Sequence, residues 1–214
     1  MKKISIFLLI IVVSFTAVVF GESNDLEESS ENNLRDSLII RTGRLVNKDN
    51  SNEFREGMTM IRGDIQIESE WGIFYERENK AEIFDNVRLR HSKGEIRSGS
   101  MIALLDDDKY IFEDDVRMLQ KLDDGEFTLL APYLELMEED NSFEANQGVV
   151  IDYSGRIIKA DDVIYNAQEE LMELFNNVYI EEENGDWVKS EKAIFYLDRN
   201  EFIAKDGVEL EIQL

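Results

Sequence analysis

The segment IFDNVRLR, residues Ile83–Arg90, decides the fold because the chain repeats it. Close copies follow as FEDDVRML, ANQGVVID, LFNNVYIE and AKDGVELE. Each copy alternates apolar with polar residues, which is typical of a β-strand with one buried face. A short pair of Asp, Asn, Gln or Gly residues precedes the central valine in every copy, and such a pair suits a turn or bulge that re-aims the strand.

Glycines in polar turns mark the period of the repeat, at about thirty residues. They are Gly63, Gly94, Gly125, Gly155 and Gly185. An incomplete earlier copy runs from Leu38 to Met60. One such unit cannot bury its apolar face alone, whereas stacked units can. The sequence therefore predicts an all-β fold, an elongated antiparallel β structure of about five stacked two-strand repeats of roughly thirty residues each.

Alternation sends one set of residues in each unit toward the interior. The eight candidates for an interior lining are Ile83, Val87, Phe112, Val116, Ala145, Val149, Leu174 and Val178, and the last copy adds Val208 and Leu210. Two interpretations remain open, an interior packed with its own side chains or one that holds a ligand. Small residues at matching positions either leave room for that ligand or permit close packing of the sheet: Ser69, Ser98, Ala131, Ala160 and Ser190.

The N-terminus, MKKISIFLLIIVVSFTAVVFGES, has two lysines, an apolar run and then small residues. We predict a signal peptide at residues 1–21, cleaved after Gly21, or an uncleaved anchor at the same place. Residues 22–37 are acidic and rich in Ser and Asn, and we expect a disordered linker there. Residues 38–214 form the predicted β domain, which either reading places outside the cytoplasm.

Composition argues against several functions. The chain has 47 acidic and 23 basic residues and a formal net charge of −24, which excludes duplex nucleic acid as a partner. Without Cys and with His91 as the one histidine, a single chain cannot assemble a nucleophile–histidine pair or a His-rich zinc site. Asp106–Asp108 lack the ligand spacing of a calcium loop, so a solvated hairpin turn is predicted.

We therefore expect no catalysis, no metal and no cofactor, and there is no glycine-rich phosphate loop to bind a nucleotide. The inventory leaves open a hydrolase that uses two carboxylates, but 47 acidic residues bring some pair together by chance.

Two half motifs recur in register through the five copies: I-x-[SA]-x-x-[AVLMG]-x-[FY] and, written loosely, [FL]-x-[DN]-[NDG]-V-x-[IL]. From about Leu38 to Leu214 they resemble the OstA-like family, the periplasmic lipopolysaccharide-transport proteins LptA and LptC and the N-terminal domain of LptD. The resemblance implies a β-jellyroll that holds lipopolysaccharide acyl chains. It also implies end-to-end contacts with LptC-like and LptD-like jellyrolls, in a periplasmic bridge to the outer membrane.

Within that family, LptA is the signal-cleaved component and LptC keeps a membrane anchor. The number of repeats and the cleavage site at Gly21 favour the LptA-like alternative. The acidity departs from what a carrier of phosphorylated headgroups is expected to have. A structural β-solenoid without cargo predicts the same periodicity and is the competing hypothesis.

Overall fold

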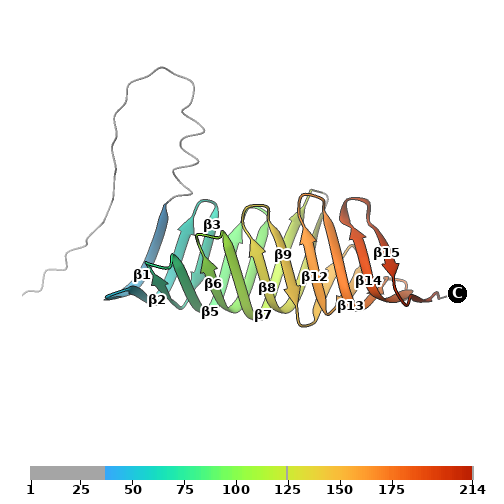
Figure 1. Ribbon diagram of the computed structural model, residues 1–214, viewed down its shortest axis with the longest axis horizontal. Helices are drawn as coiled ribbons and strands as arrows, with labels where there is room; N and C mark the ends of the chain where they lie inside the picture. Colours follow the sequence, from blue (N-terminus) through green and yellow to red (C-terminus); the bar gives the residue numbers. More distant parts are fainter. Residues whose placement is uncertain (1–36, 124, 214) are drawn as a thin grey trace, which may run out of the picture.

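The computed structural model describes residues 37–123 and 125–213. They form an elongated roll of antiparallel strands, stacked from the N-terminal to the C-terminal end of the long axis (Figure 1). Over these residues the fold is all-β, as the sequence predicts, with one short 3-10 helix, η1 (Leu197–Arg199). The predicted signal or anchor at 1–21 and the linker up to residue 36 lie outside the described residues. No helix in the described part of the chain is long and apolar enough to cross a membrane.

The strands in the N-terminal half are β1 (Leu38–Lys48), β2 (Ser51–Arg62), β3 (Ile65–Ser69), β4 (Trp71–Tyr75), β5 (Lys80–His91), β6 (Gly94–Leu104), β7 (Lys109–Leu122) and β8 (Gly125–Met137). Those in the C-terminal half are β9 (Ser142–Asn146), β10 (Val149–Tyr153), β11 (Arg156–Ala160), β12 (Asp162–Asn166), β13 (Leu171–Glu181), β14 (Trp187–Tyr196), β15 (Glu201–Lys205) and β16 (Glu209–Glu211).

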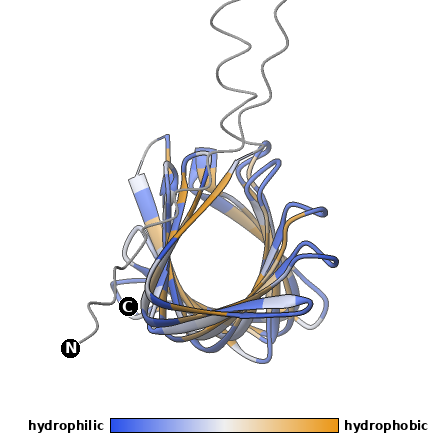
Figure 2. Cartoon of the chain, turned by 90° about the vertical axis from the view of Figure 1, so that its left-hand side faces the viewer, coloured by the Kyte–Doolittle hydropathy of each residue, from blue (hydrophilic) through white to orange (hydrophobic). Residues whose placement is uncertain are grey.

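Each long strand bends in the middle, so that its two halves belong to two opposed faces. The β4 face contains β4, β9, β12 and β15, and the β3 face contains β3, β10, β11 and β16. Strand β5 joins them, because Lys80–Phe84 pair with β4 and Arg88–Arg90 pair with β3. Viewed along the long axis, the two faces curve around a common interior (Figure 2).

The bend is made by the residue pairs that precede the valines of the repeat and, in the incomplete first copy, Met58. Both members of each pair have positive φ: Glu56–Gly57, Asp85–Asn86, Asp114–Asp115, Gln147–Gly148, Asn176–Asn177 and Asp206–Gly207. In the β5–β6 pairing the register passes from Phe84 opposite Ser100 to Val87 opposite Ser98, so two residues face one. The predicted bulges are therefore confirmed. We call this edge of the roll the corner.

Backbone hydrogen bonds continue around the corner through the single residue that faces each pair. Glu70 accepts from Gly57 N–H and donates its own N–H to Asp85 O, at 3.0 Å in both cases. The serine just before this single residue donates its hydroxyl to the carbonyl just after it, from Ser98 to Ser100 at 2.8 Å and from Ser190 to Lys192 at 3.0 Å. Bending of the strand thus accounts for the serines among the small residues.

The core is continuous along the roll and consists of the inward-facing rows of both faces. Buried apolar side chains run from Phe54 and Met58 near one end to Phe195 and Leu197 near the other. The prediction for the last copy is wrong in one respect. Val208 and Leu210 are 53% and 57% exposed, because β16 is the last strand and pairs only with β14.

Candidate functional site

The eight predicted lining residues all lie in the interior. Four of them are on the β4 face next to the corner, and the four valines start the β3 face on the other side of it. Their exposed fractions do not exceed 2%, for Ile83, Val87, Phe112, Val116, Ala145, Val149, Leu174 and Val178. The structure brings them together as two parallel rows, and contact with a ligand stays a prediction.

The interior is closed in this structure. Ile83, Phe112 and Leu174 have no exposed surface, which leaves no water-sized space beside these side chains. Aromatic side chains fill the interior farther from the corner, and Phe127, Phe143 and Tyr165 pack with ring centroids 5.0 to 6.1 Å apart. An acyl chain can therefore enter only if the two faces move apart.

The edge opposite the corner is where the turns of the two faces meet, and we call it the mouth. At its N-terminal part, Arg62 at the end of β2 reaches Asp108 at 2.7 Å and Glu138 at 3.2 Å on turns of the β4 face. The buried Tyr110 donates its hydroxyl to the same Glu138 at 2.7 Å. This group, the Arg62 clasp, ties the two faces together.

Electrostatics keep the Arg62 clasp charged and hydrogen-bonded. Burial alone would lower the pKa of Arg62, but hydrogen bonds with Asp108 and Tyr110 and the charge of Glu138 raise it. Burial, followed by the hydrogen bond to Glu138, raises the pKa of Tyr110 well above its ordinary value. Tyr110 therefore stays a donor at neutral pH.

A second clasp closes the C-terminal part of the mouth. The Tyr153 hydroxyl donates to Leu197 O at 2.8 Å, and Arg156 bonds both Asn200 and Glu182. Leu197 is only 4% exposed and covers the interior from η1.

Among the hollows along the mouth in the described part of the chain, two lie near the Arg62 clasp or between the clasps. One, of about 630 Å³, is next to the Arg62 clasp and is lined by Arg62, His91 and Glu138 among others. His91 Nε2 is buried there without a hydrogen-bond partner among the described residues, and burial lowers the pKa of His91. The other, of about 240 Å³, lies between the clasps and is lined by Lys93, Gln120 and Tyr165 among others. We call it the central mouth pocket.

The outer surfaces of the two faces differ in charge. Cross-strand pairing places one row along the β4 face in which Glu alternates irregularly with Val and Ile: Val46, Glu53, Ile73, Glu82, Ile102, Ile111, Glu135, Glu144, Ile164, Glu173, Ile194 and Ile203. The matching row of the β3 face has six basic and two acidic residues among its twelve: Arg41, Thr59, Glu68, Arg88, Arg97, Arg117, Leu130, Val150, Lys159, Tyr179, Lys189 and Glu209.

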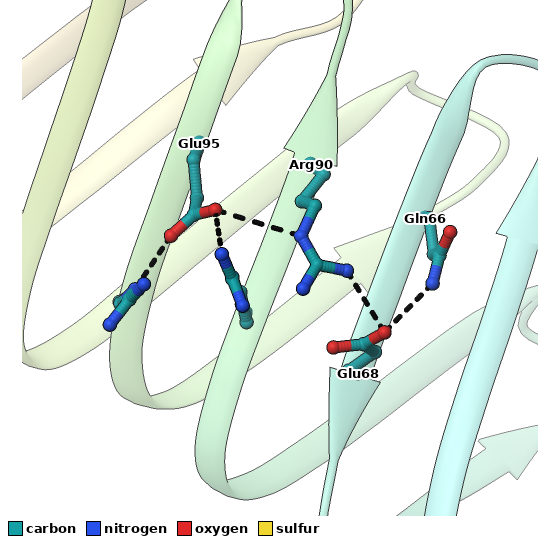
Figure 3. A network of polar contacts seen from close by, with 6 residues as sticks. Gln66, Glu68, Arg90 and Glu95 are labelled. Atoms are coloured by element: carbon teal, nitrogen blue, oxygen red, sulfur yellow. Dashed lines mark hydrogen bonds and ion pairs between the residues drawn. The ribbon is translucent and has the colours of Figure 1, made fainter.

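Part of the basic row is neutralised by a network on the β3 face. Glu95 accepts from Arg88 and Arg97 and lies 3.6 Å from Arg90, which in turn pairs with Glu68 at 2.9 Å (Figure 3). This separation of charge between the faces was not predicted from the sequence. Aligning the residue after each repeated valine would have exposed part of it, since Arg88 and Arg117 occupy that position.

Strand edges lie open at both ends of the roll, at β1 and at β15 with β16. Large apolar side chains are exposed at both ends: Ile39, Leu45 and Val46 at the first, and Ile203, Val208, Leu210 and Ile212 at the second. Strand β1 carries Arg41, Arg44 and Lys48 and no acidic residue. Strands β15 and β16 carry Glu201, Glu209 and Glu211 against Lys205 alone. The two ends are therefore of opposite charge.

No protein-family model matches the chain, and no curated protein matches it. Among solved structures the chain is similar to LptH of Pseudomonas aeruginosa, described as the LptA homologous periplasmic component of a lipopolysaccharide transport device. The match has 10% sequence identity and a TM-score of 0.30, and covers 85% of this chain and 99% of LptH. At these values it carries no inference about function.

Proposed function

We propose that the protein binds an amphipathic lipid, lipopolysaccharide in the first place, with the acyl chains in the interior of the roll. The observation that carries the proposal is the apolar core that runs unbroken between two faces, which hydrogen bonds and ion pairs join at the mouth. Each acyl methylene moved from water into such an interior contributes about 0.8 kcal/mol. Ile83, Val87, Phe112, Val116, Ala145, Val149, Leu174 and Val178 are the proposed lining.

The proposal extends to transport toward the outer membrane as one part of a bridge. The repeats that resemble the OstA-like family support it, and so do the open strand edges. An exposed edge can accept another strand, with main-chain hydrogen bonds for affinity. The basic β1 edge suits an acidic edge like that of β15 and β16. Proposed partners are LptC-like and LptD-like jellyrolls and further copies of this chain.

We place the protein in the periplasm on the basis of the predicted signal at residues 1–21. An uncleaved anchor there would instead make it an LptC-like subunit of the inner membrane. The proposed role involves no catalysis and no cofactor, so a partner has to supply the energy for transport.

A structural role without cargo is the second candidate, and the closed interior favours it. With Ile83, Phe112 and Leu174 fully buried, the roll needs no lipid to complete its core. The two candidates differ in what the purified protein contains.

Native mass spectrometry of the full chain, purified from the envelope of its producing cells without detergent, distinguishes them. The carrier hypothesis predicts a population heavier than the chain by the mass of a lipid, lost on unfolding. The Leu174→Trp variant, which takes up the interior volume that a chain would occupy after the faces move apart, should when folded lose this population, while Glu173→Trp on the outer face keeps it. A wild-type mass equal to that of the bare chain, also after incubation with lipopolysaccharide, contradicts the carrier hypothesis.

A further inference from the structure

We infer that the central mouth pocket binds the head of the amphiphile through hydrogen bonds, and that it selects heads that donate them, namely sugar hydroxyls or amide N–H groups. The inference rests on the proposed function and adds the place and the chemistry of head recognition. The pocket has a volume of about 240 Å³ and lies between the Arg62 clasp and the clasp formed by Tyr153 and Arg156.

Gln120 is the residue that points to a ligand. Its side chain is only 2% exposed, and its Oε1 is buried with no hydrogen-bond partner among the described residues. Its Nε2 makes one long bond, 3.4 Å, to Lys121 O. A buried acceptor without a donor is destabilising, and such groups in native proteins call for a specific explanation. A donor from a ligand would satisfy Oε1.

Tyr165 stands beside Gln120 in the same pocket and is also only 2% exposed. Burial, with the charges of Glu170 and Asp123, raises the pKa of Tyr165 to about 12. Its hydroxyl therefore stays protonated at neutral pH and can both donate to and accept from a sugar hydroxyl.

The pocket is also next to the part of the core that a tail would enter. The ring of Tyr165 lies 5.0 Å from that of Phe143 on the β4 face and 5.7 Å from that of Phe127 on the β3 face. Tyr165 thus lines the pocket and also packs its ring against the interior. A head held at Gln120 would place the first methylenes of its chain against these three rings.

The charged residues around the pocket favour recognition of the head by its hydrogen-bond donors, not by its charge. Lys93 and Lys121 line the pocket together with the carboxylates of Asp123, Asp140 and Glu170. Two cations and three carboxylates within one small hollow give little net preference for an anionic or a cationic head. Gln120, as a buried acceptor, discriminates instead between heads that have a donor and heads that have none.

Two detergents with the same chain test this. Dodecyl maltoside has a head rich in hydroxyl donors, and dodecyl dimethylamine oxide has a head without donors at neutral pH. Each is titrated below its micelle concentration into the folded, full chain by calorimetry. We expect the maltoside to bind roughly tenfold more tightly, since satisfying one buried acceptor contributes on the order of one factor of ten.

Gln120→Leu removes the acceptor at nearly constant volume, and Gln120→Met is a second variant that keeps the length of the side chain. Either folded variant should bind the two detergents about equally, with affinity for the amine oxide unchanged. The matched control, Gln66→Leu on the outer β3 face, should keep the wild-type preference.

A preference that survives Gln120→Leu and Gln120→Met overturns the inference, and so does equal binding of both detergents by the wild type. These results leave lipid binding by the interior standing. Binding of neither detergent overturns the proposed function together with the inference.

Discussion

At the scale of single residues, the corner depends on side chains that tolerate positive φ. Asp115 has a φ of 56° and is exposed. A β-branched residue in this conformation costs about 1–2 kcal/mol, whereas Gly adopts it freely. We predict that Asp115→Val lowers the free energy of unfolding by that amount and that Asp115→Gly leaves it equal or higher, as measured by urea denaturation. Glu113→Val, in ordinary extended backbone two residues earlier, should be neutral. An equal loss for both valine variants would mean that the corner conformation is not what matters.

The corner serines make a second contribution. Ser98→Ala removes the 2.8 Å hydrogen bond to Ser100 O from a residue that is 8% exposed. We expect a loss of about 1 kcal/mol with an unchanged urea m-value. Ser92→Ala, in an exposed turn, is the control. A loss of unfolding free energy smaller than that of Ser92→Ala would show that the serines leave room for a ligand and do not stabilise the bend.

His91 gives the stability a pH dependence of known sign. Burial lowers its pKa below the ordinary value of 6.5, so the folded state binds the proton less well than the unfolded state. Stability should be full above about pH 6.5 and fall as the pH drops toward the lowered value. His91→Gln should flatten this window in thermal unfolding. The variant should still lose stability below pH 4.5. The hydrogen bond with Arg90 lowers the pKa of Glu68, and Glu68 becomes protonated in that range. An unchanged profile in the variant would contradict this assignment.

Residue-level prediction from the sequence succeeds for burial and is incomplete for polar contacts. The inward positions follow from alternation alone, which is why Ile83, Phe112 and Leu174 could be identified. The role of Ser98 could not, because it depends on the bend. The Arg62 clasp also escaped prediction, since it joins residues far apart in the chain, 76 positions between Arg62 and Glu138. The buried Oε1 of Gln120 escaped it as well, because alternation predicts burial but not which polar atoms find a partner.

At the scale of elements, Pro132 interrupts the corner. It occupies the place of Glu70 and Asp161, each of which donates its N–H to the next corner pair. Pro has no N–H, so no such bond reaches Gln147 O at this step. A surface hollow of about 710 Å³ lies here, lined in part by Pro132, Gln147 and Gly148. The corner therefore lacks this hydrogen bond between β8 and the β9–β10 segment.

Pro132→Ala tests this reading. It supplies the missing donor, and we predict that the new amide at position 132 exchanges with deuterium about as slowly as those of Glu70 and Asp161. Exchange at Gly148 should also slow down. The overall stability should change by less than about 1 kcal/mol, since loss of Pro raises the entropy of the unfolded chain. A rapidly exchanging amide at position 132 would mean that the corner stays open there for another reason.

Element-level prediction from the sequence was right about the existence of the strands and wrong about the burial of the last one. The repeat implied two strands per unit with a turn or bulge before each valine, and β5, β6, β7, β8, β13 and β14 do run through the corner unbroken, whereas the chain is interrupted there between β3 and β4, β9 and β10, and β11 and β12. A bulge and a true turn have the same residue preferences, so the local sequence does not separate them. Val208 and Leu210 are exposed because burial requires a next strand, which the pattern itself cannot reveal.

At the scale of the whole molecule, the opposite charges of the two ends predict the direction of assembly. Arg41→Glu with Arg44→Glu reverses the charge of β1, and we expect end-to-end association in sedimentation to weaken at least about tenfold. Adding Glu209→Lys and Glu211→Lys should restore it in the same chain. Failure of this second change to restore association would indicate that the edges do not meet in this way.

The elongated apolar interior and the open edges were predictable from periodicity. The closed mouth was not, because it depends on which turns meet across the roll. This closure is what makes the central claim testable, since a carrier must open and a structural roll need not.

Photo-crosslinking tests the central claim most directly. A photoreactive residue is placed at Leu174, fully buried, and in a matched variant at Glu173, on the outer row of the same strand. A third variant at Phe112 accommodates an aromatic photoreactive group at a buried ring position. After irradiation of producing cells, we predict lipid adducts, identified by mass spectrometry, at Leu174 and Phe112 and none at Glu173. Folded, exported protein with no lipid adduct at either inward position would contradict the account.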